Sequence, residues 1–377
     1  MTRTRRGLRG SALAAVVAAA VVALAGCAGE PTAPSTTTVE PDTSGTKGVP
    51  PTPDVPLVWP LTGVAADEVA DRPALAVKVE NAPQARPQTG LEQADVVWEE
   101  VVEGGITRFV AVYHSQVPES VGPVRSVRPM DPAIVAPLHG VLAYTGGQQP
   151  FIDAVGAAGV QSVVMDEGDD GFTTTRARRA PHNVYGSPEA FWAQADDDRT
   201  SPPPAQLVFA REPGTATATV AGDAATRLDV RLTHASRAVW EWDGGEGRYV
   251  RSEGDRPAVS ADEVRLSATN VVLLAATMVD TPFKDPAGVP VPETQLVGTG
   301  EGVVARGGQQ GAVPWAQAGG EAPRGPARAR RAARRAGGRP PRRHPAGGAR
   351  RLRLPGRRPR RVAGHGQLRP VGPDLRG

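Results

Sequence analysis

The stretch VVWEEVVEGGITRFVAVY, residues 96–113, decides the fold of this chain. Residues 96–102 and 106–113 are rich in β-branched and aromatic residues, and Gly104-Gly105 separates them, a pattern typical of a hairpin with a two-residue turn. In that register one face carries Trp98, Val102, Phe109 and Tyr113, and the other carries Glu99, Glu103 and Arg108, with the arginine diagonal to both acids. A helix over residues 91–102 is the alternative, because its apolar residues also follow a helical spacing.

An α/β domain is predicted around this hairpin, over residues 56–205. Apolar residues alternate over 75–80, which predicts a half-buried strand. A short helix is expected after Asp131, with that residue as its N-cap and Pro132 at its first position. Residues 141–144 predict a further strand, and Gly146-Gly147 predicts a turn into a helix over residues 150–158.

Residues 206–323 predict a second, smaller domain that is rich in β-structure. Residues 215–220 alternate, residues 239–242 and 249–251 flank a turn over 243–247, and residues 271–276 are expected to form a core strand. The predicted fold class is therefore an α/β (α+β) domain followed by a smaller β-rich domain.

The N-terminus has the layout of a bacterial lipoprotein signal peptide over residues 1–26. Four arginines precede a 14-residue apolar run over 12–25, too short to span a bilayer, and the run ends in Leu24-Ala25-Gly26-Cys27. We expect the mature chain to begin at Cys27, the only cysteine, and to carry a thioether-linked lipid there. That lipid would hold the protein on the outer face of the cytoplasmic membrane, and the Pro, Thr and Ser of residues 27–55 predict an extended tether that lifts the folded part off the membrane.

The charge is distributed very unevenly along the chain. Residues 324–377 hold 18 arginines and one acid, whereas residues 27–323 carry a net charge of −18. We expect no nucleic-acid partner for a body this acidic, because binding to nucleic acid needs a positive field.

The tail itself, residues 324–377, is dominated by Arg, Gly, Ala and Pro, a composition that cannot bury a core. A shifted reading frame in GC-rich DNA produces this composition, which suggests that the native frame ends near Pro323; an intact frame through the tail would contradict that hypothesis. The alternatives are a genuine basic appendage and the product of a decayed or mis-sequenced gene.

A series of ordered motifs resembles the YerB-like bacterial lipoproteins, a family defined by a domain of unknown function. The motifs are PLTG (60–63), NAPQARPQTG (81–90), QAD (93–95), VEGGITRF (102–109), GPVRSVRP (122–129) and APHN (180–183). The resemblance covers residues 60–323 and implies an α/β domain followed by a β-rich domain. It implies no reaction.

Arg108, Arg125 and Arg128, together with the Gly146-Gly147 turn, form the first candidate site. Guanidinium forks and free N–H groups at a helix start both favour carboxylate or phosphate, so an anionic ligand is expected there. The alternative is structural: Arg108 pairs with Glu99 and Glu103 across the hairpin, and the other two arginines pair with Asp131 or nearby acids.

His182 and Asn183 form the second candidate, with Glu99 or Glu103 as acid/base partners of the histidine and with His139 and His114 as possible additions. That set would suit an envelope hydrolase, whereas a loop-ordering role for His182 and Asn183 is the favoured interpretation. No histidine pair has metal-ligand spacing, and no nucleotide or hydrolase motif occurs, so neither metal nor cofactor is expected. The favoured function is a binding or accessory protein of the cell envelope, not an enzyme, with an anionic envelope polymer or peptide as its partner.

Overall fold

The computed structural model describes residues 56–317. The predicted signal peptide, Cys27, the tether and the tail over 324–377 lie outside the described residues. Among residues 56–317, no helix is long and apolar enough to cross a membrane.

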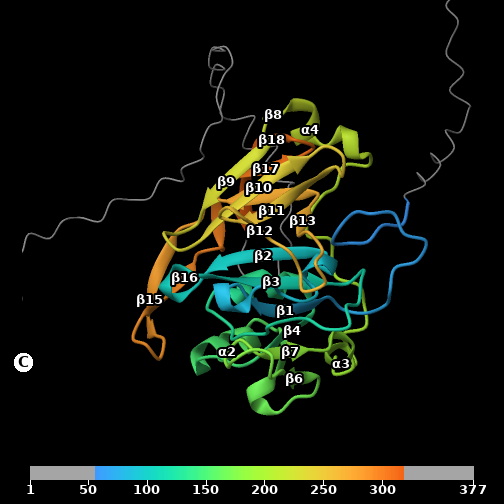
Figure 1. Ribbon diagram of the computed structural model, residues 1–377. Coiled ribbons are helices and arrows are strands. Elements are labelled where there is room, and N and C mark those ends of the chain that lie inside the picture. Colours follow the sequence, from blue (N-terminus) through green and yellow to red (C-terminus); the bar gives the residue numbers. More distant parts are fainter. Residues whose placement is uncertain (1–55, 318–377) are drawn as a thin grey trace, which may run out of the picture. The chain divides into compact units, whose positions relative to one another are not determined.

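A five-stranded mixed sheet forms the N-terminal domain, in the order β2-β3-β1-β4-β5 (Figure 1). Its strands are β1 (Leu75–Glu80), β2 (Val96–Val101), β3 (Thr107–Tyr113), β4 (Val141–Tyr144) and β5 (Gln161–Val164). Strand β1 pairs antiparallel with β3 and parallel with β4. Helices α1 (Asp131–Val135) and α2 (Gln149–Ala157) pack on one face, whereas α3 (Pro188–Trp192) and the ribbon of β6 (Phe172–Thr174) and β7 (Val184–Gly186) pack on the other.

Strand β1 is buried on both faces, so the predicted half-buried strand is wrong. All six of its residues are buried, including Lys78 and Glu80. The alternation in the sequence arose because two charged side chains lie inside the domain, not because one face meets solvent. A buried charge is costly unless it is paired, so both residues need partners.

The hairpin is present, and the helix over 91–102 is not, but the predicted turn is wrong. A three-residue 3-10 turn, Glu103–Gly105, joins β2 to β3, and the Val102 N–H donates to the Ile106 carbonyl at 2.9 Å. The extra loop residue shifts the pairing by one position, so Glu99 lies opposite Phe109, and Glu100 lies opposite Arg108. A shift of one residue exchanges the faces of a strand, so the predicted grouping of side chains is wrong as well.

The C-terminal domain is built from two small sheets and a ribbon. The first sheet has the order β12-β11-β10-β9, with β13 paired to β11, the second has the order β14-β17-β18-β8, and β15 pairs with β16. The strands are β8 (Asp223–Ala224), β9 (Arg227–Arg231), β10 (Arg237–Asp243), β11 (Arg248–Glu253), β12 (Arg256–Pro257), β13 (Ser267–Ala268), β14 (Asn270–Leu274), β15 (Met278–Lys284), β16 (Pro290–Thr294), β17 (Gly298–Arg306) and β18 (Gln309–Gln317). Leu228 and Tyr249 of the first sheet share a small core with Val271 and Ala305 of the second. The predicted α/β domain followed by a smaller β-rich domain is confirmed.

Some predicted elements of this region differ from the structure. Residues 217–221 form helix α4 (Thr217–Ala221), not part of a strand over 215–220. Only Ala218 in that helix is buried, and Val220 is exposed, so the alternation had no buried face behind it. Strand β14 ends at Leu274, and Val271 is its one buried residue. In the N-terminal domain, the N-cap of α1 is Met130, one residue before the predicted cap, because the carboxylate of Asp131 turns inward.

Candidate functional site

A cluster of buried charges lies beside β1, on the face of the sheet that α1 covers. Lys78 is fully buried, and its ammonium group donates to the carboxylates of Glu100 on β2 and Asp131 on α1, the latter at 2.7 Å. Burial has the largest influence on this amine and lowers the pKa of Lys78 to about 8, although Asp131 opposes the shift. Both carboxylates are therefore needed to hold the amine inside the domain.

Two of the predicted arginines complete this cluster. The guanidinium of Arg128 binds Glu103 as a fork, with N–O distances of 2.8 and 2.7 Å. Its backbone N–H donates to Asp131 Oδ2 at 2.6 Å. Arg108 donates to the Ser126 carbonyl at 2.7 Å, and burial together with the nearby Arg128 and Arg125 lowers the pKa of Arg108 below its usual value.

We call Lys78, Glu100, Glu103, Arg108, Arg128 and Asp131 the Lys78 cluster. It contains three cations and three acids, all buried, so its formal charge is balanced. Among the described residues, Arg108 makes no ion pair with Glu99 or Glu103, so the predicted pairs across the hairpin are not formed. A buried cluster whose charges balance has the character of a structural element, because it offers an anion no excess positive charge.

Glu80 links this interior to the surface. One of its oxygens lies 3.4 Å from Arg125 Nε, and the other lies 2.8 Å from His182 Nδ1. The Glu80 side chain is 3% exposed, whereas those of Arg125 and His182 are 22% and 23% exposed. Because an ionised carboxylate only accepts, Nδ1 donates, and Nε2 remains without a partner among residues 56–317.

His182 lines a surface cavity of about 430 Å³, which we call the His182 pocket. The lining residues are Gln84, Ala177, Arg178, Arg179, Ala180 and His182. Residues 171–188, which supply most of the lining, contain three arginines and no acid. Residues 27–323 carry a net charge of −18, so this acid-free segment forms a local positive surface on an otherwise acidic protein.

The Gly146-Gly147 turn precedes α2 as predicted, but its surroundings do not suit an anion. A Cβ added at Gly146 would collide with the carboxylate of Asp166, and one at Gly147 would lie 2.8 Å from Val127 Cγ2. The turn instead accepts a hydrogen bond, from the Val127 N–H to the Gly146 carbonyl, at 3.0 Å. A negative group therefore already lies where an anionic ligand would have to approach.

The remaining histidines and Asn183 do not gather around His182. His114 is buried, contacts Trp59 edge to face and lies within hydrogen-bonding distance of the Ala70 carbonyl. His139 is exposed in a left-handed conformation at the end of a 3-10 helix. Asn183 donates to the Thr175 carbonyl at 3.5 Å, and its own carbonyl accepts from the Thr175 N–H at 2.9 Å, so Asn183 ties the two ends of the loop together.

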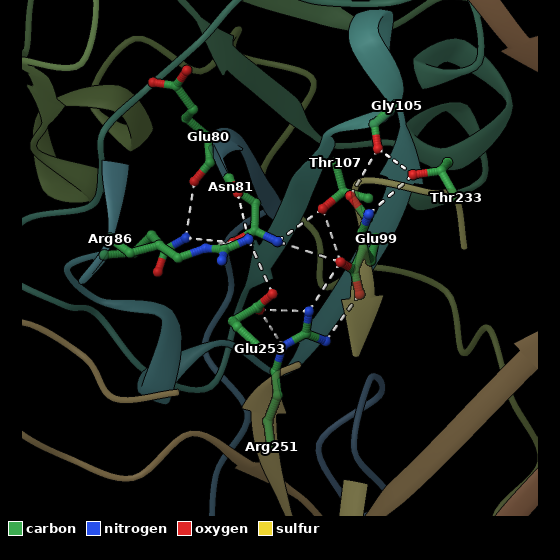
Figure 2. A network of polar contacts seen from close by, with 11 residues as sticks. Glu80, Asn81, Arg86, Glu99, Gly105, Thr107, Thr233, Arg251 and Glu253 are labelled. Atoms are coloured by element: carbon green, nitrogen blue, oxygen red, sulfur yellow. Dashed lines mark hydrogen bonds and ion pairs between the residues drawn. The ribbon is translucent and has the colours of Figure 1, made fainter. Parts of the chain in front are cut away.

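Glu99 belongs to a different network, in which β11 of the C-terminal domain contacts the N-terminal sheet (Figure 2). Arg251 donates to both Glu99 oxygens at 2.9 Å and to Glu253 at 2.8 Å. Thr107 donates to Glu99 and accepts from Asn81, which extends the network to the NAPQARPQTG motif. The carboxylate of Glu99 is thus committed to a contact between the two domains.

The acid/base set predicted for catalysis is not assembled as expected. His182 is bonded to Glu80, whereas Glu103 is paired with Arg128 and Glu99 with Arg251. No hydroxyl group among residues 56–317 donates to His182, so the described part of the chain presents no activated nucleophile there. In the same range no three metal-binding side chains gather at one place.

The sequence did not lead us to select Lys78, Glu80 or the three arginines of residues 176–179 as site residues. The two charges in β1 could have been found, because a strand in the middle of an α/β sheet is normally apolar throughout, and charges there call for buried partners. The RARR sequence at 176–179 was visible directly before the APHN motif. Its lack of nearby acids was the overlooked signal.

The chain combines an α/β domain with a β-rich domain, and comparisons with known proteins give the same division. Residues 61–201 match the profile of the protein of unknown function (DUF3048) N-terminal domain, and residues 228–329 match the C-terminal domain of the same family. The second match extends past Arg324, the first residue of the arginine-rich tail.

A curated sequence and a solved structure that are similar to this chain both carry the name YerB. A stretch of 73 residues is 55% identical to YerB of Bacillus subtilis (strain 168), whose name marks it as a candidate lipoprotein; the match spans 19% of this chain and 22% of that protein. The crystal structure of the YerB protein from Bacillus subtilis is similar to 69% of this chain and 87% of its own, with 25% identity and a TM-score of 0.60. The chain belongs to the YerB-like family.

Proposed function

We propose that this protein is a membrane-anchored extracytoplasmic lipoprotein that binds an anionic ligand of the cell envelope at the His182 pocket. The observation that carries the proposal is the arginine-rich segment over 175–183, which joins β6 to β7 and contains no acid, on a strongly acidic protein. Guanidinium groups recognise carboxylate and phosphate better than any other side chain does.

The predicted ligand residues take two different roles in this proposal. Arg125 does not line the pocket, but it is part-exposed and shares Glu80 with His182, which does, so we place Arg125 beside the pocket. Arg108 and Arg128 are buried in the Lys78 cluster and position the segment that carries Arg125. Asn183 holds the loop, and the acidic surroundings of Gly146 and Gly147 leave that turn outside the site.

Replacing Arg125 by alanine is expected to weaken anion binding at least about tenfold, because one charge-assisted contact to the ligand is lost. Its one ion pair is long, and His182 remains as a partner of the buried Glu80, so the unfolding midpoint of the free protein should fall less than after the loss of a fully buried pair. Thermal unfolding of the full chain in detergent, with and without inorganic phosphate or citrate, measures both the stability of the free protein and its binding of the anion. Such anions also stabilise folded proteins by exclusion from the surface, so only a rise that saturates counts as binding to the folded state.

The matched control is Arg211→Ala, which removes an exposed arginine elsewhere on the domain. It should leave anion binding unchanged. The proposal is contradicted if neither anion raises the midpoint of the unmodified protein, or if Arg125→Ala and Arg211→Ala bind the anions equally well.

Anchoring is proposed to occur through a lipid on Cys27, which the name of the Bacillus relative also supports. In a bacterium that processes lipoproteins, the unmodified chain should fractionate with the membrane, and a Cys27→Ser variant should lose at least about tenfold of that fraction, because a lipid chain contributes about 0.8 kcal/mol for each buried methylene. Immunoblots of the fractions measure this. Equal membrane fractions for the two chains would show that Cys27 is not the anchor.

A further inference from the structure

We infer that the His182 pocket is built for a single phosphomonoester group, such as the phosphorylated end of an envelope polymer. This inference rests on the proposed function and adds the chemical class of the ligand. It also brings in Arg178 and Arg179, which line the pocket, and the exposed Arg176, which lies just outside the lining. No comparison assigns a role to any of the three.

Arg178 supplies a fixed positive charge at the pocket wall. Its guanidinium donates to the Gln84 carbonyl at 2.8 Å and to the Pro87 carbonyl at 2.6 Å. Both partners are neutral carbonyl groups, so they orient the guanidinium without neutralising its charge. A fixed cation costs little conformational entropy when a ligand binds, which makes it an effective anchor.

Arg176 and Arg179 are exposed, and neither makes an ion pair or a side-chain hydrogen bond with any residue in the range 56–317. Among the other exposed arginines of residues 56–317, Arg227 pairs with Glu241, whereas Arg211, Arg231, Arg248 and Arg256 make no ion pair. Arg176 and Arg179 lie within residues 171–188, which contain no acid. Their five N–H donors each are therefore available to a ligand.

The number of cations distinguishes phosphate from carboxylate. A carboxylate carries one charge on two oxygens, which a single guanidinium fork can satisfy. A phosphomonoester carries about −1.5 to −2 charges and three acceptor oxygens, so it matches two or three guanidinium groups. With Nδ1 donating to Glu80, the free Nε2 atom of His182 is an acceptor in the neutral ring, so it can accept from the protonated oxygen of a singly protonated phosphomonoester.

The limited extent of the positive surface favours one phosphate group over a long polyanion. The three arginines lie within four residues, whereas residues 27–323 as a whole carry −18. Successive phosphates of a nucleic acid would leave the pocket and meet a negative field. A single terminal phosphate would not.

The test is thermal unfolding of the full chain in detergent, titrated with glycerol 3-phosphate and, separately, with acetate. Glycerol 3-phosphate should raise the midpoint in a saturable manner, and acetate at the same concentration should not. The double variant Arg176→Ala/Arg179→Ala should bind glycerol 3-phosphate at least about a hundredfold more weakly, because two charge-assisted contacts are lost. Both side chains are exposed and unpaired in the described structure, so the variant should unfold like the unmodified protein.

Arg211→Ala is the control for the loss of positive charge and should bind as the unmodified chain does. Equal binding of acetate, or full binding by the double variant, would overturn the inference. If citrate binds through Arg125 while glycerol 3-phosphate does not bind, the inference fails and the proposed function stands. If no anion binds, both fail.

Discussion

Replacing Asp131 by alanine is expected to lower the free energy of unfolding by about 3–5 kcal/mol. The carboxylate accepts from the ammonium of Lys78 at 2.7 Å and from the backbone N–H of Arg128 at 2.6 Å, and all three groups are buried. Without it, Lys78 keeps only Glu100, and the Lys78 cluster holds an uncompensated positive charge. Denaturant unfolding of the full chain measures the loss.

Asp255→Ala is the matched control, because Asp255 also pairs with an arginine, but its side chain is 88% exposed. This control should change the stability little, since exposed ion pairs contribute little. A loss for Asp131→Ala as small as that of Asp255→Ala would contradict the structural role of the Lys78 cluster.

Replacing Arg251 by alanine should also lower the free energy of unfolding by about 3–5 kcal/mol. Burial works against the charge of this guanidinium, but Glu99 and Glu253 outweigh that effect and raise its pKa above the usual value. Its removal leaves two part-buried carboxylates without their shared cation and breaks the contact between β11 and the N-terminal sheet. Differential scanning calorimetry should show a lower midpoint, and the two domains should no longer unfold in one transition.

Arg248→Ala, at the exposed start of the same strand, is the control for a lost arginine on β11. It should leave the transition single and close to that of the unmodified chain. An unchanged, single transition for Arg251→Ala would show that Arg251 does not couple the two domains.

The sequence predicted the elements whose signal is local. Strand β4 has the predicted bounds, 141–144, because a short apolar run between glycines leaves few alternatives. The hairpin of β10 and β11 forms around the predicted turn, in which the Asp243 side chain accepts from the N–H groups of Gly245 and Glu246. Such turn chemistry depends only on neighbouring residues.

Errors arose where distant parts of the chain decide the outcome. The pattern of β1 could not show that both faces are covered, since α1 and α3 lie far along the sequence. The hairpin register depended on one residue of loop length. The predicted two-residue turn and the observed three-residue turn both contain Gly104 and Gly105, so the sequence did not distinguish them. The helix α4 forms in a segment of small residues whose alternation carried little information.

For the candidate site, too, the sequence predicted individual residues but not the contacts made by distant parts of the chain. Sequence reasoning selected Arg125 and His182, which the structure links through Glu80. It grouped Arg125 with Arg108 and Arg128 as a ligand site. Its structural alternative paired Arg125 and Arg128 with Asp131 or nearby acids, and Arg128 does contact Glu103 and Asp131. The partners of a buried charge come from separate elements, so they emerge only once the chain is folded.

The most direct test of anion binding at the His182 pocket is a titration followed by NMR of the histidine side chains. The chain has six histidines, and a His182→Gln variant assigns the signal. Adding inorganic phosphate or citrate to the full chain in detergent should shift the His182 signal in a saturable manner, while the buried His114 signal stays in place. A His182 signal that does not move, while the histidines of residues 324–377 do, would place anion binding in the tail and contradict the account.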